Sequence, residues 1–366
     1  MVTIISFILI LGILVLMHEW GHFITARRLG VEVEEFGLGF PPRLFSWKKK
    51  GVVYSLNLIP IGGFVKIRGE DGSDDDPHSF ASQPTWKKSL IVSAGVVMNV
   101  VLSIALLSLV FYMGIPQILD KNFDDSRVSQ RSVIIADILE DSPAQQAGLS
   151  VNDKILTING EEVKLATQVY EMVTKNSDKE ISLRLDRDQE IKEYTLRPQL
   201  IAADRPPLLG IAVSDIGVVK YNIGQSLWQG IKNTFFMIGM IFQALYNLLA
   251  NLIRTGELDT GLSGPVGVAV ITGQIVKLGF LHILQFMAIL SVNLAVLNIL
   301  PIPALDGGRL LFIILEKIRG RKLNVKVEGW IHNSGFVLLI ILIIFITFRD
   351  IGRYGGQILE SLKNLF

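Results

Sequence analysis

The sequence predicts a polytopic α-helical membrane protein with about four transmembrane helices, a membrane-associated β-hairpin and one inserted α+β domain. Half of the 366 residues are hydrophobic, only 19% are charged, and the mean hydropathy is +0.45. A soluble protein of this length usually carries more charge. The apolar residues also form uncharged runs that are long enough to cross a bilayer, so the composition favours an integral membrane protein.

The net charge limits the classes of binding partner, and the cysteine content limits the possible metal ligands. The net charge of +1 gives no indication of nucleic-acid binding, and we expect no nucleic-acid partner. The chain has no cysteine. It therefore folds without disulfides, and any metal ion must be bound by His, Asp or Glu.

Four segments are predicted to cross the membrane. Residues 1–26, 89–116 and 280–300 are apolar, and a shorter run at 335–348 is expected to extend backward through Gly329. The first run has no basic residues before it and no cleavage site of small residues at its end. We therefore predict a span there rather than a cleaved signal peptide.

A fifth uncharged run, residues 233–253, is interpreted differently. On a helical wheel the polar side chains of this region fall within about 100° of arc. They are Gln225, Gln229, Lys232, Asn233, Gln243, Asn247, Asn251 and Arg254. This pattern predicts an amphipathic helix at the membrane surface, and a fifth span is the alternative.

The polar segments between the spans are predicted to contain β-structure. Runs rich in β-formers at 52–56 and 64–67 flank a Pro-Ile-Gly-Gly sequence, which predicts a hairpin over residues 54–67. Residues 128–200 read as a soluble α+β domain, with strands at 133–136, 154–158 and 181–185 and a short helix at 143–148.

The predicted organisation has four parts. Residues 1–127 form the first half of a membrane core, and residues 128–200 form the inserted domain. Residues 201–262 form a linker and the surface helix, and residues 263–366 form the second half of the core.

The first span contains the sequence His18-Glu19-Trp20-Gly21-His22. Residues four apart share one face of a helix, so His18 and His22 can bind one metal ion and Glu19 can reach a water on that ion. Ionisable groups inside a membrane segment are costly and are functional by default. The alternative is two histidines near a membrane interface that are hydrated by water.

Asp306 is the candidate third ligand. The run 298–308 ends the third span with two prolines, which break the helix, and with a Gly-Gly pair, which lets the backbone turn closely. An unpaired Asp at that depth would be expensive, and zinc would satisfy it. The alternative is that Asp306 only caps the helix that follows.

The predicted topology brings these three side chains to one side of the membrane. With one span between them, the first and third spans run in the same direction, and both end near the candidate ligands. The loops 27–88 and 309–330 hold ten and six Lys or Arg residues, so both are predicted to be cytoplasmic. The inserted domain then lies outside, and the metal site lies near the cytoplasmic side.

At these residues the chain resembles the bacterial site-2 proteases, especially the regulator of sigma-E protease group. The shared sequences are the HEWGH motif and residues 36–40, 59–66, 264–267 and 298–308. The resemblance implies Zn²⁺ bound by His18, His22 and Asp306, with Glu19 as the general base. It also implies that Asn298 positions the substrate near the metal.

The same resemblance implies roles for the predicted hairpin and for the inserted domain. The hairpin would receive the unwound substrate as an added strand, with Tyr54, Gly62, Gly63 and Phe64 as substrate-positioning residues. Residues 144–149 and 152–155 are similar to the PDZ domain of these enzymes. One departure is Gly95-Val96, because members often have Gly-Pro before the asparagine of the second span.

The function implied is that of a zinc-dependent intramembrane endopeptidase in the bacterial cytoplasmic membrane. Its substrates would be single-span membrane proteins, such as anti-sigma factors or signal-peptide remnants. The alternative is a non-proteolytic, zinc-bound scaffold that binds partners through the PDZ-like domain, for which Glu19 would be dispensable. A metal transporter is disfavoured because no further chain of polar residues crosses the spans.

Overall fold

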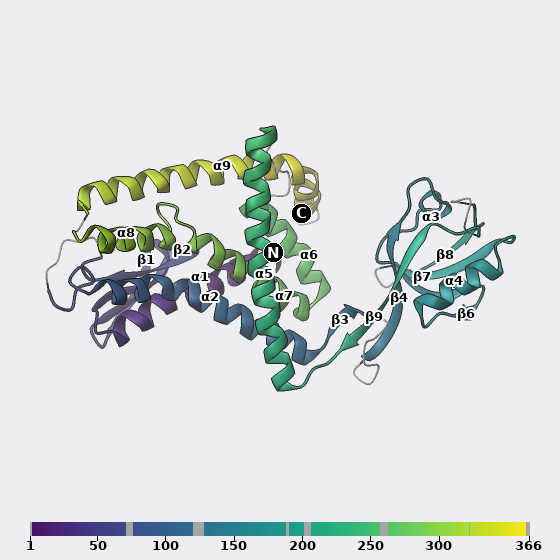
Figure 1. Ribbon diagram of the computed structural model, residues 1–366, viewed down its shortest axis with the longest axis horizontal. Coiled ribbons are helices and arrows are strands. Elements are labelled where there is room, and N and C mark those ends of the chain that lie inside the picture. The colour runs from purple at the N-terminus through teal and green to yellow at the C-terminus, as the bar shows by residue number, and fades with distance from the viewer. Residues whose placement is uncertain are drawn as a thin grey trace. The chain divides into compact units, whose positions relative to one another are not determined.

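The computed structural model describes residues 2–70, 76–119, 128–187, 190–200, 206–256, 263–321 and 323–363. They form two compact units (Figure 1). The larger unit combines Met1–Val110 with Gln225–Phe366, and the smaller unit is Phe111–Gly224.

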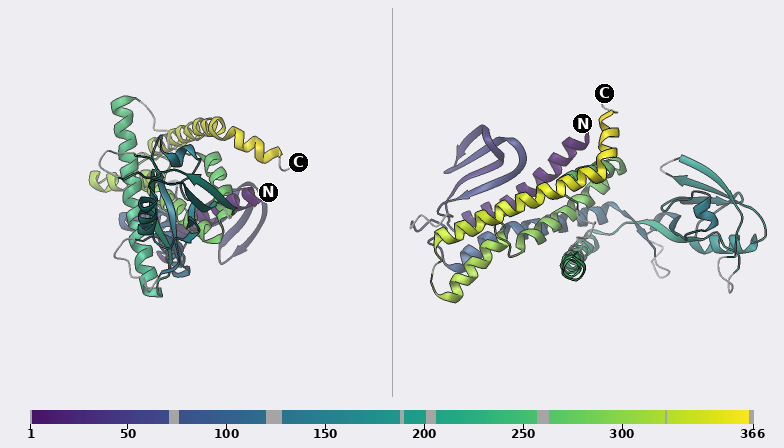
Figure 2. Two further views of the ribbon diagram at one scale, coloured as in Figure 1. Left: turned by 90° about the vertical axis from the view of Figure 1, so that its right-hand side faces the viewer. Right: turned by 90° about the horizontal axis from the view of Figure 1, so that it is seen from above.

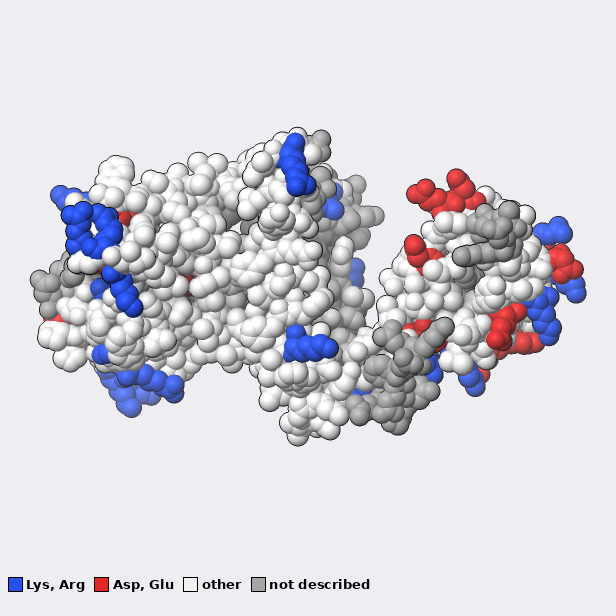
Figure 3. Space-filling view, viewed as in Figure 1, with Lys and Arg blue, Asp and Glu red and all other residues white. Residues whose placement is uncertain are grey.

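The larger unit is a helical assembly with one sheet. Its helices are α1 (Val2–Arg28), α2 (Thr85–Met113), α5 (Ile223–Thr255), α6 (Pro265–Leu278), α7 (Phe280–Ile299), α8 (Asp306–Arg319) and α9 (Val325–Lys363). Within the described residues, α1, α2, α5, α7 and the Val325–Gly356 part of α9 are long and apolar enough to cross a membrane. On the face drawn in Figure 3 this unit has a broad uncharged surface, and charged side chains gather mainly at the end where β1, β2 and α8 lie.

The predicted spans at 1–26, 89–116 and 280–300 correspond to α1, α2 and α7, and the fourth lies within a longer helix, α9. Ile10 and Leu14 of α1 pack with Met287 of α7 in a buried cluster to which α2 also contributes. A Cβ atom added to Gly21 would clash with the carbonyl oxygen of Ala94. Glycine therefore lets α1 and α2 cross in backbone contact one residue before His22.

Helix α5 runs across the direction of α1, α2 and α9, as both views of the larger unit show (Figures 1 and 2). The small residues Gly230 and Thr234 in its first half are buried and contact α2. The Thr234 hydroxyl lies 3.3 Å from the Ser103 hydroxyl, and a Cβ atom on Gly230 would clash with the Ser108 hydroxyl. Small residues thus allow close contact at this crossing.

The sheet of the larger unit differs from the predicted hairpin. Strands β1 (Val33–Lys49) and β2 (Val52–Ile67) are antiparallel, and Lys50 and Gly51, with φ of 50° and 84°, form the turn between them. The prediction of a hairpin turn at 60–63 was wrong, because residues 52–56 and 64–67 do not pair with each other. Both pair with the first half of β1, on opposite sides.

This arrangement follows from a bend in β2. Phe36 is opposite both Tyr54 and Val65, and residues 45–49 of β1 add a further row beside 52–56. Gly62, with φ of 99°, adopts a backbone conformation that favours glycine between the two halves of β2. The spatial order is therefore 64–67, 33–38, 52–56 and 45–49, so the 64–67 row forms one edge of the sheet.

The smaller unit is a sheet with two helices. Its strand order is β3-β9-β4-β5-β7-β8, and β6 pairs with β5. The elements are β3 (Ile115–Ile118), β4 (Val128–Ile138), α3 (Pro143–Gln146), β5 (Lys154–Ile158), β6 (Glu161–Glu162), α4 (Ala166–Lys175), β7 (Ile181–Arg187), β8 (Glu190–Leu196) and β9 (Ile211–Val219). The predicted strands lie in β4, β5 and β7, and α3 begins at the start of the predicted helix.

The sheet also extends into a segment that was predicted as a linker. Strand β9 lies within 201–262 and pairs with both β3 and β4, so the unit reaches from Phe111 to Gly224 rather than from 128 to 200. Residues 201–205 and 257–262 of that segment lie outside the described residues. The pairing depends on contacts distant in sequence, which local patterns do not reveal.

Candidate metal centre

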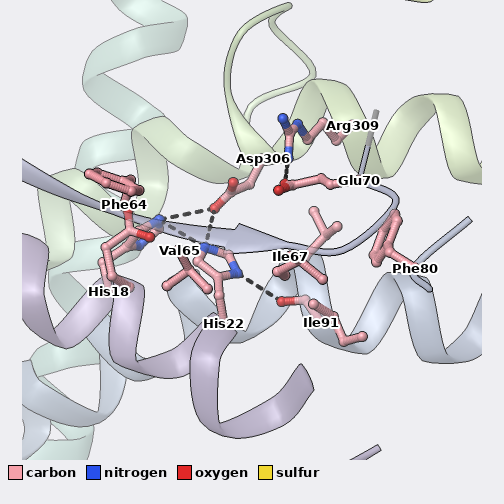
Figure 4. A pocket seen from close by; sticks show the side chains of 12 residues that line it. His18, His22, Phe64, Val65, Ile67, Glu70, Phe80, Ile91, Asp306 and Arg309 are labelled. Carbon is pink, nitrogen blue, oxygen red and sulfur yellow. Dashed lines mark hydrogen bonds and ion pairs between the residues drawn. The ribbon is translucent and has the colours of Figure 1, made fainter. Parts of the chain in front are cut away.

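Three of the predicted site residues meet in one cluster (Figure 4). Helix α1 places His18 and His22 one turn apart on the same buried face, and their Nε2 atoms are 3.2 Å apart. The Asp306 Oδ2 atom lies 3.1 Å from His18 Nε2 and 3.4 Å from His22 Nε2. The structure therefore brings together two side chains from α1 and one from the start of α8.

Close backbone packing between the end of α7 and the start of α8 positions Asp306 in this cluster. Helix α7 ends at Ile299 and α8 begins at Asp306, so the chain reverses within a few residues. A Cβ atom on Gly307 would clash with the carbonyl oxygens of Ile299 and Leu300, so only glycine permits this return. His332 of α9 accepts a hydrogen bond from the Ala304 amide at 3.0 Å, and this holds the turn.

Helix α2 forms the wall behind the histidines, a role that the sequence analysis missed. The His22 Nδ1 atom lies 2.8 Å from the Ile91 carbonyl oxygen, and the His18 Nδ1 atom lies 3.3 Å from the Asn99 carboxamide. Gly95 lies between them, so positions 91, 95 and 99 line one face of α2. The available signal was Asn99 itself, because it is the one carboxamide in the apolar run 89–116.

The cluster has the chemistry of a cation site. His22 donates its Nδ1 proton to the Ile91 carbonyl, so its Nε2 atom presents a lone pair to Asp306 and His18. The Asp306 Oδ2 atom is buried and accepts no hydrogen bond within the described part of the chain. The His22 Nε2 lone pair and the Asp306 carboxylate oxygen, 3.4 Å apart, would repel each other, and a bound cation removes that repulsion.

Space for the cation is provided by Gly95. A Cβ atom at this position would clash with His22 Nε2 and lie 2.8 Å from His18 Nε2, so only glycine leaves the volume between the two nitrogen atoms open. The candidate ligand atoms all lie within 4.8 Å of one another. Two imidazoles and a carboxylate, with a fourth position open, are a donor set typical of catalytic zinc.

Glu19 and the edge of the sheet line the pocket that contains this cluster. The pocket has a volume of about 250 Å³, and Glu19, Phe64, Val65 and Asp306 are among its lining residues. β2 passes beside the two histidines (Figure 4). An ion pair between Arg309 of α8 and Glu70, just after β2, also borders the pocket.

The predicted substrate-positioning residues are distributed unevenly. Phe64 lines the pocket, a Cβ atom on Gly63 would lie 3.5 Å from Glu19 Cγ, and the Asn298 amide nitrogen lies 3.3 Å from His18 Nε2. Gly62 lies at the bend of β2 and is not among the lining residues. Tyr54 is also absent from the lining, because its ring stacks on Trp47 with the ring centroids 5.5 Å apart.

Comparisons with known proteins agree with this chemistry. The family described as "Peptidase family M50" matches residues 6–342. The zinc metalloprotease RasP of Oceanobacillus iheyensis is 31% identical, over 96% of this chain and 99% of that one. The regulator of sigma-W protease RasP of Bacillus subtilis is 28% identical, over 96% and 98%.

Solved structures are also similar to this chain. One of them is the PDZ domain of an SdrC-like protein from Listeria innocua, which is 22% identical and covers 22% of this chain and 92% of that one. The TM-score is 0.20, which supports no inference about the fold.

Proposed function

The chain belongs to peptidase family M50 and is a zinc-dependent metalloendopeptidase, and from this premise we propose that it cuts transmembrane segments of other proteins inside the bilayer. The observation that carries the proposal is the convergence of Asp306 with His18 and His22 beside Glu19, because α1, which holds the last three, is long and apolar enough to cross a membrane. Anti-sigma factors and signal-peptide remnants are substrates of the class we propose.

The proposed reaction is peptide hydrolysis with Glu19 as the general base. His18, His22 and Asp306 would hold the zinc ion, which would supply an activated water and polarise the scissile carbonyl. Glu19 takes a proton from the water as its oxygen bonds to the carbonyl carbon. When the C–N bond breaks, Glu19 delivers that proton to the leaving nitrogen, so the products are a carboxylate and an amine.

The substrate must present an extended backbone to this site, because the carbonyls of a helix are already hydrogen-bonded. We propose that it adds as a strand beside Phe64 and Val65, at the edge of the sheet and on the side of β2 that faces away from β1. Phe64 and Val65 line the pocket, so a strand added there passes Glu19. The Asn298 carboxamide, near His18, would hold the substrate backbone close to the metal.

A groove in the larger unit provides room for the helical part of the substrate. Its volume is about 810 Å³, and its walls are mainly apolar side chains of α1, α5, α6, α7 and α9. Leu14 and Val15 belong to the wall one turn before His18 and Glu19, and Leu297 precedes Asn298. We propose that a substrate's transmembrane segment occupies this groove, because both surfaces are apolar and the groove leads to the catalytic turn.

We expect Ala244→Trp on α5 to block transmembrane substrates specifically. The indole would project into the groove, and overpacking of about 1–3 kcal/mol against a bound segment corresponds to roughly 5- to 150-fold slower cleavage of a single-span substrate. Zinc content and cleavage of a short soluble peptide should be unchanged. Leu249→Trp, at an exposed position of α5 outside the groove, is the matched control.

Two results would count against the proposal. A wild-type enzyme that cuts the soluble peptide but leaves the single-span substrate intact would rule out the intramembrane activity. Equal losses in the Ala244→Trp and Leu249→Trp variants would assign the effect to α5 in general rather than to occupation of the groove.

We propose that the smaller unit is a PDZ-like domain that binds an extended peptide. Strand β9 pairs with β4 along its length, and β3 pairs with it only over Ile216–Val219. The Ala166 amide donates to Asp215 at 2.8 Å, so α4 begins beside β9. A peptide could add as a strand next to residues 211–214. Such binding would either recruit substrates or exclude bulky ones.

Four crossings, by α1, α2, α7 and α9, are the topology we propose. Helices α1 and α7 both run toward the metal centre, so the chain must cross the membrane in the opposite direction between them. α2 provides that return, α5 runs across the other helices, and α6, with 14 residues, spans about 21 Å of a core that is about 30 Å thick. The ten and six Lys or Arg residues of loops 27–88 and 309–330 support a metal centre near the cytoplasmic side.

Cysteine labelling tests this topology directly, since the chain has no cysteine. Single cysteines at Gln225 and Gly256 flank most of α5, and we expect both to react with an impermeant reagent from outside the cell. A cysteine at Lys50, in the cytoplasmic loop, should react only after permeabilisation. Labelling of just one of the first two positions would make α5 a fifth span.

A further inference from the structure

We infer that Asn99 of α2 is a positioning residue for the metal ligand His18. Its carboxamide oxygen accepts the Nδ1 proton of His18 and so keeps the Nε2 atom free to bind the metal. The inference rests on the proposed ligand set of His18, His22 and Asp306. It assigns a role to a residue outside the HEWGH motif and the three proposed ligands.

The two histidines have outer hydrogen-bond partners of different kinds. His22 has a backbone partner, the Ile91 carbonyl, which no side-chain substitution can remove. His18 has a side-chain partner, Asn99, whose carboxamide nitrogen Nδ2 lies 3.3 Å from the Nδ1 atom. The orientation of His18 therefore depends on the identity of residue 99.

Asn99 is held firmly enough to act in this way. The residue is 0% exposed, and the Ser291 hydroxyl of α7 donates to its backbone carbonyl at 2.8 Å. This bond fixes α2 against α7, the helix that leads to Asp306. Because Ile91 and Asn99 lie two turns apart on the same face of α2, one helix sets the orientation of both imidazoles.

Metal binding dictates which end of the carboxamide faces His18. A neutral imidazole carries its proton on one nitrogen only. If the Asn99 amide nitrogen donated to Nδ1, the proton would reside on Nε2, and that atom could not bind a metal. A half-turn of the carboxamide, which has the same shape in both orientations, puts the oxygen there instead.

The oxygen is available for this bond. In the described structure the Asn99 Oδ1 atom is buried and has no hydrogen-bond partner. When it accepts the Nδ1 proton of His18, the Nε2 lone pair points toward Asp306, as the Nε2 lone pair of His22 does. Loss of an outer partner of this kind typically weakens metal binding by about 10- to 100-fold.

The test compares zinc affinity, measured by chelator competition on the purified full-length protein, in three variants. Asn99→Leu removes the acceptor at similar size and should weaken zinc binding by roughly 10- to 100-fold. Asn99→Asp keeps an oxygen in the same place and should stay within about threefold of wild type. Ser103→Ala removes a different buried polar group of α2, the partner of Thr234, and should leave zinc affinity unchanged.

The outcomes distinguish the role of Asn99 as a hydrogen-bond acceptor from its contribution to packing. Wild-type affinity in Asn99→Leu, or equal losses in Asn99→Leu and Asn99→Asp, would overturn the inference. If Asn99→Leu does not fold, Asn99→Ala makes the same comparison without added bulk. The absorption spectrum of the cobalt-substituted protein gives a second readout, because altered coordination by His18 would change it.

His18→Ala in the same series separates this inference from the proposed ligand set. If His18→Ala retains wild-type zinc affinity, the ligand set itself is incorrect. If His18→Ala loses zinc and Asn99→Leu does not, the ligand set stands and only the role of Asn99 fails.

Discussion

Glu19→Gln is expected to retain zinc and to lose cleavage activity by roughly a hundredfold to ten-thousandfold, the range that a positioned general base contributes. Glutamine preserves the size of the side chain but cannot take a proton from water. Glu19 borders the pocket without belonging to the proposed ligand set of His18, His22 and Asp306, so the metal site should stay intact. The measurements are kcat on a single-span substrate and zinc content.

Glu34→Gln is the matched control for this substitution. Glu34 lies on the sheet and pairs with Lys66 at 2.7 Å, and it does not line the pocket. Its replacement should change neither turnover nor zinc content, because exposed ion pairs contribute little. Undiminished turnover in Glu19→Gln would refute the mechanism, and a protein with no measurable turnover in any form would favour the scaffold interpretation.

Gly95→Ala is expected to weaken zinc binding by at least the 10- to 100-fold that loss of an outer partner costs, and to abolish cleavage with it. The added methyl group would come closer than 3.0 Å to the Nε2 atoms of His18 and His22, a separation that real Cβ atoms essentially never show. One imidazole must therefore move out of the ligand position. The measurements are zinc affinity by chelator competition and turnover.

Gly12→Ala separates this local effect from a general effect on helices. A Cβ atom on Gly12 of α1 would meet nothing within 4 Å. Both substitutions add one methyl group to an apolar helix and improve helix propensity by about 1 kcal/mol. Only Gly95→Ala should lose zinc, and normal zinc affinity in that variant would mean that the metal lies elsewhere than between the two imidazoles.

Local sequence patterns predicted the residues on which the proposed chemistry depends. His18 and His22 follow from helical periodicity, because two residues four apart share a face wherever the helix lies. Asp306 required a further step, since only the direction of the spans related it to α1. The structure brings these three side chains together.

Features that depend on packing between distant segments were not predictable in this way. The Ile91 carbonyl belongs to the site because α1 crosses α2 at Gly21, and no side chain marks that position. The two halves of β2 pair with opposite sides of β1, whereas the sequence suggested that they pair with each other. Strand β9 pairs with strands that come earlier in the sequence, so the local pattern of residues 211–219 did not indicate a strand and the segment was predicted as a linker.

The position of Asp306 has a consequence for biosynthesis. The proposed ligand set joins the first helix of the chain to a residue about 290 positions later. A catalytic zinc needs three protein ligands, so a nascent chain that has inserted only α1 and α2 lacks one of them. At a synthesis rate of about 5–20 residues per second, the third ligand follows tens of seconds after the first two. During that interval the protease cannot cut, and its activity begins only when its own C-terminal half has joined the membrane.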